Sequence, residues 1–85
     1  MTNKNEMGRL LWQCRRGMKE VEVFLLPYLE RFYFDASEGE KTLFNKLLTC
    51  EDPDMFEWFV NRAVPEDNEL AEIVGIVLQR LASRP

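Results

Sequence analysis

Apolar residues recur along the chain at the three- and four-residue spacing that is typical of an α-helix. In the first such segment, over about residues 5–16, one stripe contains Met7, Leu10, Leu11 and Cys14. The same pattern continues in residues 18–33, 37–50, 52–60 and 66–81. A stripe of this kind buries one face of its helix against neighbouring helices. The sequence therefore predicts an all-α bundle of five short helices with short connections.

Capping residues indicate where two of these helices begin. Ser37 is followed three positions later by Glu40, which is the pattern of a capping box. Asp52 stands directly before Pro53, and this pair is typical of a helix N-cap followed by proline in the first turn. We therefore expect the third helix to begin after Ser37 and the fourth to be capped by Asp52.

Two other residues are expected to shape the backbone of the first two helices. Gly17 follows the first helix, and glycine adopts a positive φ there without steric cost, so we expect it to end that helix. Pro27 lies inside the second helix and has no N–H to donate, so we expect a kink at this position.

The chain has 85 residues and no linker or internal repeat, so we expect one domain over residues 1–85, with residues 1–6 flexible. The longest uncharged stretches contain seven residues, far below the roughly 20 that cross a bilayer. No apolar segment of the kind found in signal peptides follows the first methionine. These features predict a cytoplasmic protein that does not insert into a membrane.

The absence of histidine removes most acid–base, nucleophilic and zinc chemistry. The cysteines, Cys14 and Cys50, are 36 positions apart and form no Cys-x-x-Cys motif. Cys14 belongs to the first apolar stripe, so we expect a buried and unreactive thiol. We therefore expect neither an enzyme nor a metal site.

Charge is distributed unevenly along a chain whose net charge is −4. Residues 1–20 carry five basic and two acidic residues, whereas residues 21–85 carry six basic and 13 acidic residues. An acidic body repels phosphates everywhere except at the basic end, so we expect no nucleic-acid binding. The pattern favours a polarised surface for contact with another protein.

The two tryptophans lie off the apolar stripes of their helices. Arg9, Trp12 and Arg16 share the opposite face of the first helix, where cation–π stacking would stabilise them and where tryptophan and arginine are frequent in binding surfaces. The alternative is that Trp12 packs against another helix. Trp58 either extends a contact surface or packs against the fifth helix.

The segment RRGMKE, residues 15–20, joins the first two helices and concentrates charge at their junction. Its arginines suit a helix C-terminus and Glu20 suits a helix N-terminus. Glycine at position 17 allows the backbone of a partner to approach closely. The same pattern is also that of an ordinary helix–turn–helix corner, and the residues alone do not decide between the two.

Residues 16–20, RGMKE, resemble the RGxxE motif of the SdhE family of flavinylation factors, which assist assembly of succinate dehydrogenase. Further stretches resemble the family at matching spacing: Leu11–Arg15, Pro27-Tyr28 and Leu47–Trp58, the last of which contains CEDPDMFEW. The resemblance extends over about residues 8–80, and the motif positions show no departure from it.

The resemblance implies a small helical protein that binds the flavoprotein subunit of succinate dehydrogenase and, in some bacteria, of fumarate reductase. Such proteins promote covalent attachment of FAD to a histidine of that subunit. By position, the resemblance implies that Arg16, Gly17 and Glu20 bind the partner. From their charges, we expect Arg16 to pair with carboxylates or backbone carbonyls of the partner and Glu20 to pair with a cation. The full set of predicted partner-binding residues is Arg9, Trp12, Arg15, Arg16, Gly17, Met18, Lys19 and Glu20.

We expect FAD to be handled in the partner flavoprotein, because this chain has no histidine to link and no glycine-rich dinucleotide-binding motif after a strand. We expect the free protein to be a monomer. The alternative function is that of an antitoxin or another stoichiometric protein-binding regulator that uses the same RGxxE surface.

Overall fold

The computed structural model describes residues 4–82, and within this range it contains five α-helices, one short 3-10 helix and no strand. The elements in chain order are α1 (Lys4–Cys14), α2 (Lys19–Arg31), η1 (Tyr33–Asp35), α3 (Glu38–Leu47), α4 (Asp52–Phe59) and α5 (Asn68–Ala82). The predicted all-α bundle of five short helices is therefore confirmed. Of residues 1–6, for which flexibility is a prediction, residues 4–6 form the start of α1 and residues 1–3 lie outside the described range.

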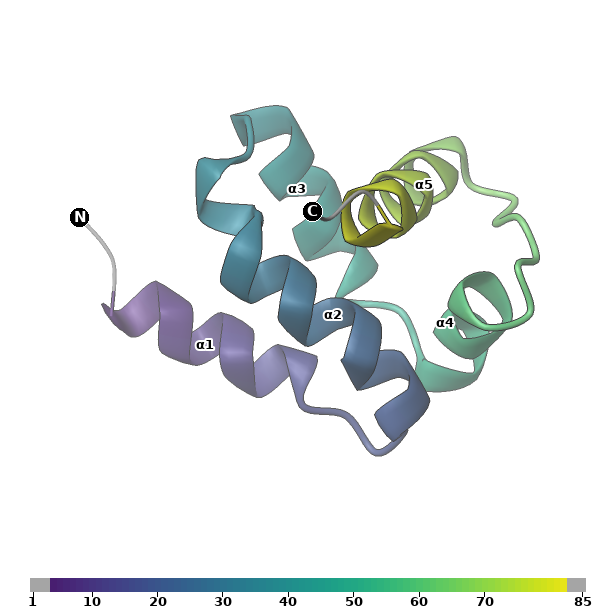
Figure 1. Ribbon diagram of the computed structural model, residues 1–85, viewed down its shortest axis with the longest axis horizontal. Coiled ribbons are helices and arrows are strands. Elements are labelled where there is room, and N and C mark those ends of the chain that lie inside the picture. The colour runs from purple at the N-terminus through teal and green to yellow at the C-terminus, as the bar shows by residue number, and fades with distance from the viewer. Residues whose placement is uncertain (1–3, 83–85) are drawn as a thin grey trace.

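Helix α2 lies at the centre of the bundle (Figure 1) and packs against α1, α4 and α5. Helix α3 packs against α5. Tyr28 of α2 and Phe44 of α3 bring their ring centroids within 4.7 Å, so aromatic contact also joins these two helices. The core draws on all five α-helices and η1: Leu10, Cys14, Val21, Leu25, Tyr28, Leu29, Tyr33, Phe44, Leu47, Leu48, Met55, Phe59, Ile73, Val74 and Val77.

The predicted stripes are confirmed in most positions, and the differences have local causes. Val60 was expected in the buried stripe of the fourth helix, but it is 40% exposed because α4 ends at Phe59. Pro27 lies within an α-helix that continues on both sides of it. Gly17 does not adopt a positive φ, so the expected left-handed end of α1 is wrong, and α1 ends earlier, at Cys14.

Ser37 caps α3 as predicted, since its hydroxyl accepts a hydrogen bond from the Glu40 N–H at 3.1 Å. The reciprocal hydrogen bond of a capping box, from the Ser37 N–H to the Glu40 carboxylate, is not found among the described residues. The Glu40 carboxylate instead accepts hydrogen bonds from the Tyr28 hydroxyl and from the Arg80 guanidinium. One carboxylate therefore links α3 to α2 and α5, and burial together with this hydrogen bond raises the pKa of Tyr28.

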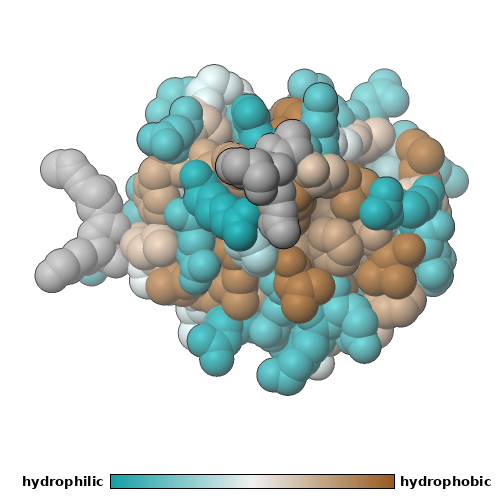
Figure 2. Space-filling model, in the orientation of Figure 1, coloured by the Kyte–Doolittle hydropathy of each residue, from teal (hydrophilic) through white to brown (hydrophobic). Residues whose placement is uncertain are grey.

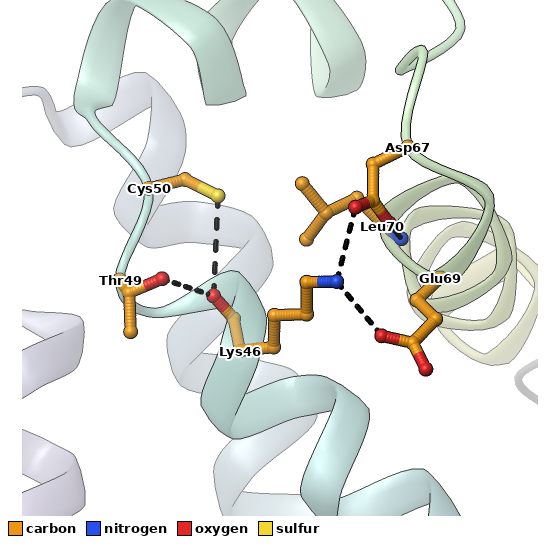
Figure 3. A network of polar contacts seen from close by, with 6 residues as sticks. All are labelled: Lys46, Thr49, Cys50, Asp67, Glu69 and Leu70. Atoms are coloured by element: carbon orange, nitrogen blue, oxygen red, sulfur yellow. Dashed lines mark hydrogen bonds and ion pairs between the residues drawn. The ribbon is translucent and has the colours of Figure 1, made fainter.

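The beginning of α5 is held to the end of α3 by one lysine (Figure 3). Lys46 Nζ lies 3.0 Å from Asp67 Oδ2 and 2.7 Å from Glu69 Oε1. Asp67 also accepts a hydrogen bond from the Leu70 N–H at 3.0 Å, and this bond, with Lys46, lowers the pKa of its carboxyl group. Acidic residues at the start of α5 were predicted from the helix dipole, and here they also fix the packing of α5 on α3.

No helix within residues 4–82 has both the length and the apolar character that a membrane span requires.

Replacing Glu40 with glutamine should test the link between α2, α3 and α5. Burial opposes ionisation of Glu40, but hydrogen bonds from Arg80 and Tyr28 outweigh it and lower the pKa of the carboxyl group. We expect Glu40→Gln to reduce the free energy of unfolding at pH 7 by about 1 kcal/mol, or the melting temperature by about 4–8 °C. The measurement is thermal unfolding followed by circular dichroism.

The pH dependence of this difference follows from the sign of the shift. A lowered pKa stabilises the fold above the pKa of the unfolded chain, and this contribution is lost as the pH falls through the folded-state pKa. The wild type and Glu40→Gln should therefore converge in acid. Glu38→Gln is the matched control, because the Glu38 side chain is 93% exposed on the same helix. Equal melting temperatures for the two variants at pH 7 would contradict the proposed role of Glu40.

Candidate functional site

The corner between α1 and α2, residues 15–20, is closed by backbone hydrogen bonds. The Arg15 N–H donates to the carbonyls of Leu11 and Trp12 at 3.1 and 3.2 Å, which ends α1 in a tight turn. Met18 then takes an extended conformation as the N-cap of α2, and its carbonyl accepts from the Val21 N–H at 3.1 Å. The chain thus reverses direction within a few residues.

The Arg16 guanidinium lies inside this corner and bonds to four acceptors. Its Nε is 2.7 Å from Asp52 Oδ1, so the two residues form an ion pair. Its Nη1 donates to the carbonyls of Gln13 and Leu48 at 2.9 and 3.1 Å, and Nη2 donates to the carbonyl of Cys50 at 2.6 Å. The Arg16 side chain is only 16% exposed.

The position of this guanidinium has an electrostatic explanation. The Gln13 carbonyl belongs to the last turn of α1, and the Leu48 and Cys50 carbonyls follow the last turn of α3. A cation is favoured at such helix C-termini, where carbonyls lack intrahelical donors. Asp52 lies in the first turn of α4, where an anion is favoured. One ion pair therefore stands where three helix ends meet, with its cation at the ends of α1 and α3 and its anion at the start of α4.

A second carboxylate fixes the backbone of the same residue. The Arg16 N–H donates to Glu22 Oε2 at 2.6 Å, from the first turn of α2. Both the backbone and the side chain of Arg16 are thus held by acidic residues of other elements. The expectation that Asp52 caps α4 is wrong in detail: Glu51 occupies the N-cap position without a side-chain bond, and the Asp52 carboxylate is used by Arg16.

Gly17 is exposed beside this pair and takes no conformation that is reserved for glycine. A Cβ atom at position 17 would meet only Asp52 Oδ2, at 3.9 Å, which is an ordinary contact. The fold therefore has room for a side chain here. Glycine at this position leaves open the space through which a partner would approach.

Four of the predicted residues point their functional groups outward from the corner. Trp12 is 78% exposed, and Arg15, Lys19 and Glu20 are also exposed. Within the described chain, no salt bridge involves Arg15, Lys19 or Glu20. These charges remain available to another molecule.

The expected cation–π stripe on α1 is not formed. Arg9 donates to Gln13 Oε1 at 2.8 Å and to Asn45 Oδ1 at 3.3 Å, and Arg16 turns inward. Over residues 4–82, the cation–π contacts are those of Lys41 with aromatic residues near η1. Trp12 was expected either to be exposed or to pack on another helix, and the structure shows the former, without stacking.

The remaining candidates are Met18 and the tryptophan of α4. Met18 is half-buried and packs against the core, so it supports the corner from inside. Trp58 is half-buried and lines a hollow with Val74 and Leu78 of α5, which confirms the expected alternative of packing against the fifth helix.

A shallow apolar groove continues from the corner along α2. Its volume is about 280 Å³, and its lining residues are Lys19, Glu22, Val23, Leu26 and Pro27. Val23 is 60% exposed. On the face of the molecule that Figure 2 shows, brown hydrophobic residues reach the surface across the middle, among teal hydrophilic ones.

Sequence reasoning missed Asp52 and Glu22 as parts of the corner. Asp52 had a sufficient explanation as a helix cap, and Glu22 lies two positions beyond Glu20, the last predicted residue. The only sequence indication was that residues 47–58 resemble the same family as the RGxxE motif. The structure shows that these two stretches meet at Arg16.

Cys14 is fully buried, which confirms the predicted burial, and burial raises the pKa of its thiol to about 12. Cys50 is half-buried, and burial raises the pKa of its thiol as well. Neither cysteine forms a disulfide. Among residues 4–82, no group of three His, Cys, Asp or Glu residues could hold a metal ion.

The fold and the corner define a class: a small helical protein in which exposed charges, without an ion pair among residues 4–82, and an exposed tryptophan surround the turn between the first two helices. The sequence profile of a family described as "Flavinator of succinate dehydrogenase" matches residues 8–81. The chain belongs to this family, and the resemblance seen in the RGxxE and CEDPD stretches is confirmed.

Similar proteins from three bacteria carry the name FAD assembly factor SdhE. The protein of Idiomarina loihiensis is 45% identical over 73 residues, which cover 86% of this chain and 81% of that protein. That of Pseudomonas putida is 43% identical over 81 residues, or 95% and 96% of the two chains. That of Yersinia pestis is 41% identical over 77 residues, or 91% and 88%. These names describe an assembly factor and not an enzyme.

The different surroundings of the two cysteines predict different reactivity toward a thiol reagent. In a Cys50→Ser variant, Cys14 should react about tenfold or more slowly than Cys50 does in a Cys14→Ser variant, because a buried thiol reacts only when the fold opens. The measurement is the labelling rate with a chromogenic disulfide at pH 8. Equal rates in the folded variants, followed by equal rates in denaturant, would contradict the assigned burial.

Proposed function

We propose that this protein is an assembly factor that binds the flavoprotein subunit of succinate dehydrogenase and promotes covalent attachment of FAD to a histidine of that subunit. The observation that carries the proposal is the corner itself, where Trp12, Arg15, Lys19 and Glu20 are exposed around a turn held by Arg16. Membership of the flavinator family and the names of the relatives support the same function. They do not favour the antitoxin-like alternative.

The chemistry of the proposal lies in the partner. The chain has no histidine, so the residue that becomes linked to FAD belongs to the flavoprotein. In this proposal the factor has no FAD site of its own and binds one conformation of the flavoprotein, in which FAD and the acceptor histidine are held in reactive geometry. Selective binding of one conformation shifts the population toward it, and positioning of reacting groups accelerates their reaction.

The charges of the corner determine the kind of surface that it fits. Arg15 and Lys19 require acidic or carbonyl groups on the partner, and Glu20 requires a cation. Trp12 adds a large apolar surface of the type that is frequent at the centre of interfaces. We infer a partner surface of mixed charge with an apolar depression, and an affinity that falls as salt concentration rises.

The finer parts of the proposal concern location and assembly. Both cysteines are free, which is typical of proteins in a reducing compartment, and we place the protein in the cytoplasm. We propose that it is a monomer when free and that the flavoprotein of fumarate reductase is a second partner in bacteria that contain it.

The proposed function is tested by co-expressing the flavoprotein subunit with and without this chain. Covalently bound flavin is read as in-gel fluorescence of the denatured subunit. The proposal requires markedly more fluorescence with the chain present. Equal fluorescence in both cultures, with the chain expressed and folded, would overturn it.

Gly17→Arg should abolish this effect without unfolding the protein. The fold has room for the new side chain at position 17, but the side chain would fill the space in front of the corner. We expect affinity for the flavoprotein to fall about tenfold or more, measured by biolayer interferometry. Gly75→Arg is the matched control, because a Cβ atom at Gly75 meets nothing within 4 Å and α5 lies outside the corner.

If Gly17→Arg and Gly75→Arg both bind like the wild type, the corner is not the docking surface. Melting curves of both variants should lie close to that of the wild type. A loss of folding confined to Gly17→Arg would mean that the corner has a structural role beyond the one described.

A further inference from the structure

Two segments that are distant in the sequence meet at one side chain. Arg16 belongs to the corner, and its acceptors Leu48, Cys50 and Asp52 belong to the turn between α3 and α4. In Figure 1 the beginning of α4 lies beside the beginning of α2. The α3–α4 turn and the corner are therefore one structural unit, connected through the Arg16 guanidinium.

Arg16 has little capacity left for a partner. A guanidinium has five N–H donors, and that of Arg16 already makes four hydrogen bonds to acceptors within this chain. Its side chain is 16% exposed, whereas the neighbouring Arg15 is exposed and forms no ion pair within residues 4–82. Arg15 is therefore better placed than Arg16 to pair with groups of the partner, as had been expected of Arg16.

Asp52 is the anion that balances this charge. Its side chain is 21% exposed, and its Oδ1 lies 2.7 Å from Arg16 Nε. Removing the carboxylate would leave a largely buried cation without its counter-ion, and such a cation moves toward solvent. Because Arg16 lies between Arg15 and Gly17 in the chain, its movement would displace the exposed residues of the corner.

We propose that Asp52 is a positioning residue for docking: through Arg16 it holds the corner in the conformation that the flavoprotein subunit recognises. This inference rests on the proposed function and extends it to a residue outside the RGxxE motif. A corner held in its bound conformation loses less conformational entropy on binding than a mobile one. Asp52 thus contributes to affinity without contacting the partner.

The first test compares Asp52→Asn with Asp54→Asn. Both substitutions remove an acid from the first turn of α4, but Asp54 is exposed and is not paired with Arg16. We expect Asp52→Asn to weaken binding to the purified flavoprotein subunit about tenfold, and Asp54→Asn to leave it unchanged. Asp52→Glu keeps the charge and should recover much of the lost affinity.

A double-mutant cycle separates positioning from direct contact. We expect Arg16→Gln to weaken binding, and we expect Asp52→Asn to have little further effect in the Arg16→Gln background, because Asp52 acts through Arg16. An undiminished effect of Asp52→Asn in that background would show that Asp52 contacts the partner, and would overturn the inference.

The salt dependence of binding distinguishes a charged residue that contacts the partner from one that does not. Arg15→Gln removes a charge that faces the partner, so its affinity should depend less steeply on salt than that of the wild type. Asp52→Asn should weaken affinity at every salt concentration and keep the wild-type slope. All variants are measured well below their melting temperatures, as determined by circular dichroism.

The outcomes distinguish the inference from the function on which it rests. If the wild type does not bind the flavoprotein, the proposed function fails and the inference fails with it. If the wild type binds and Asp52→Asn binds equally well, with only a lower melting temperature, the inference alone is wrong. If Asp52→Asn does not fold, Asp52→Glu must bind more weakly than Asp54→Asn for the inference to stand.

Discussion

The interaction on which the corner depends is the placement of one guanidinium at the meeting point of three helix ends. Arg16 bonds to a carbonyl in the last turn of α1 and to two carbonyls that follow α3, and it pairs with Asp52 at the start of α4. Each of these helix ends leaves backbone groups that require partners. The largely buried Arg16 guanidinium bonds to carbonyls at the ends of α1 and α3, and its counter-ion Asp52 stands in the first turn of α4, so this set of bonds ties the end of α1 to the α3–α4 turn.

The consequence for function is a division between neighbouring residues. Arg16 faces inward and fixes the backbone, while Arg15, Lys19 and Glu20 face outward and retain their charges for another molecule. Elsewhere in the fold, a single charged side chain also connects several helices. Glu40 joins α2, α3 and α5, and Lys46 joins α3 to α5 (Figure 3). These bridges join helices around the modest core that a chain of this size can bury.

Much of the fold was predictable because its determinants are local. Helical spacing identified the five helices and the burial of Cys14, and Ser37 was recognised as a cap, whereas the exposure of Trp12 had been left open. The ion pair between Arg16 and Asp52 was not predictable, since it joins residues 36 positions apart and no local pattern specifies which acid a given arginine meets. For the same reason Glu40 was assigned to its own helix end, although its carboxylate lies closer to Tyr28 and Arg80. Local propensity locates helices, whereas long polar side chains are placed by the packing of those helices.

The central claim is that the α1–α2 corner is the surface that docks on the flavoprotein. Hydrogen–deuterium exchange of this chain, free and in complex with the flavoprotein subunit, tests it most directly. The account predicts slower exchange at residues 15–20 in the complex, with exchange in the α4–α5 connection unchanged. Protection confined to the α4–α5 connection or to α5, with the corner exchanging as in the free protein, would contradict the account.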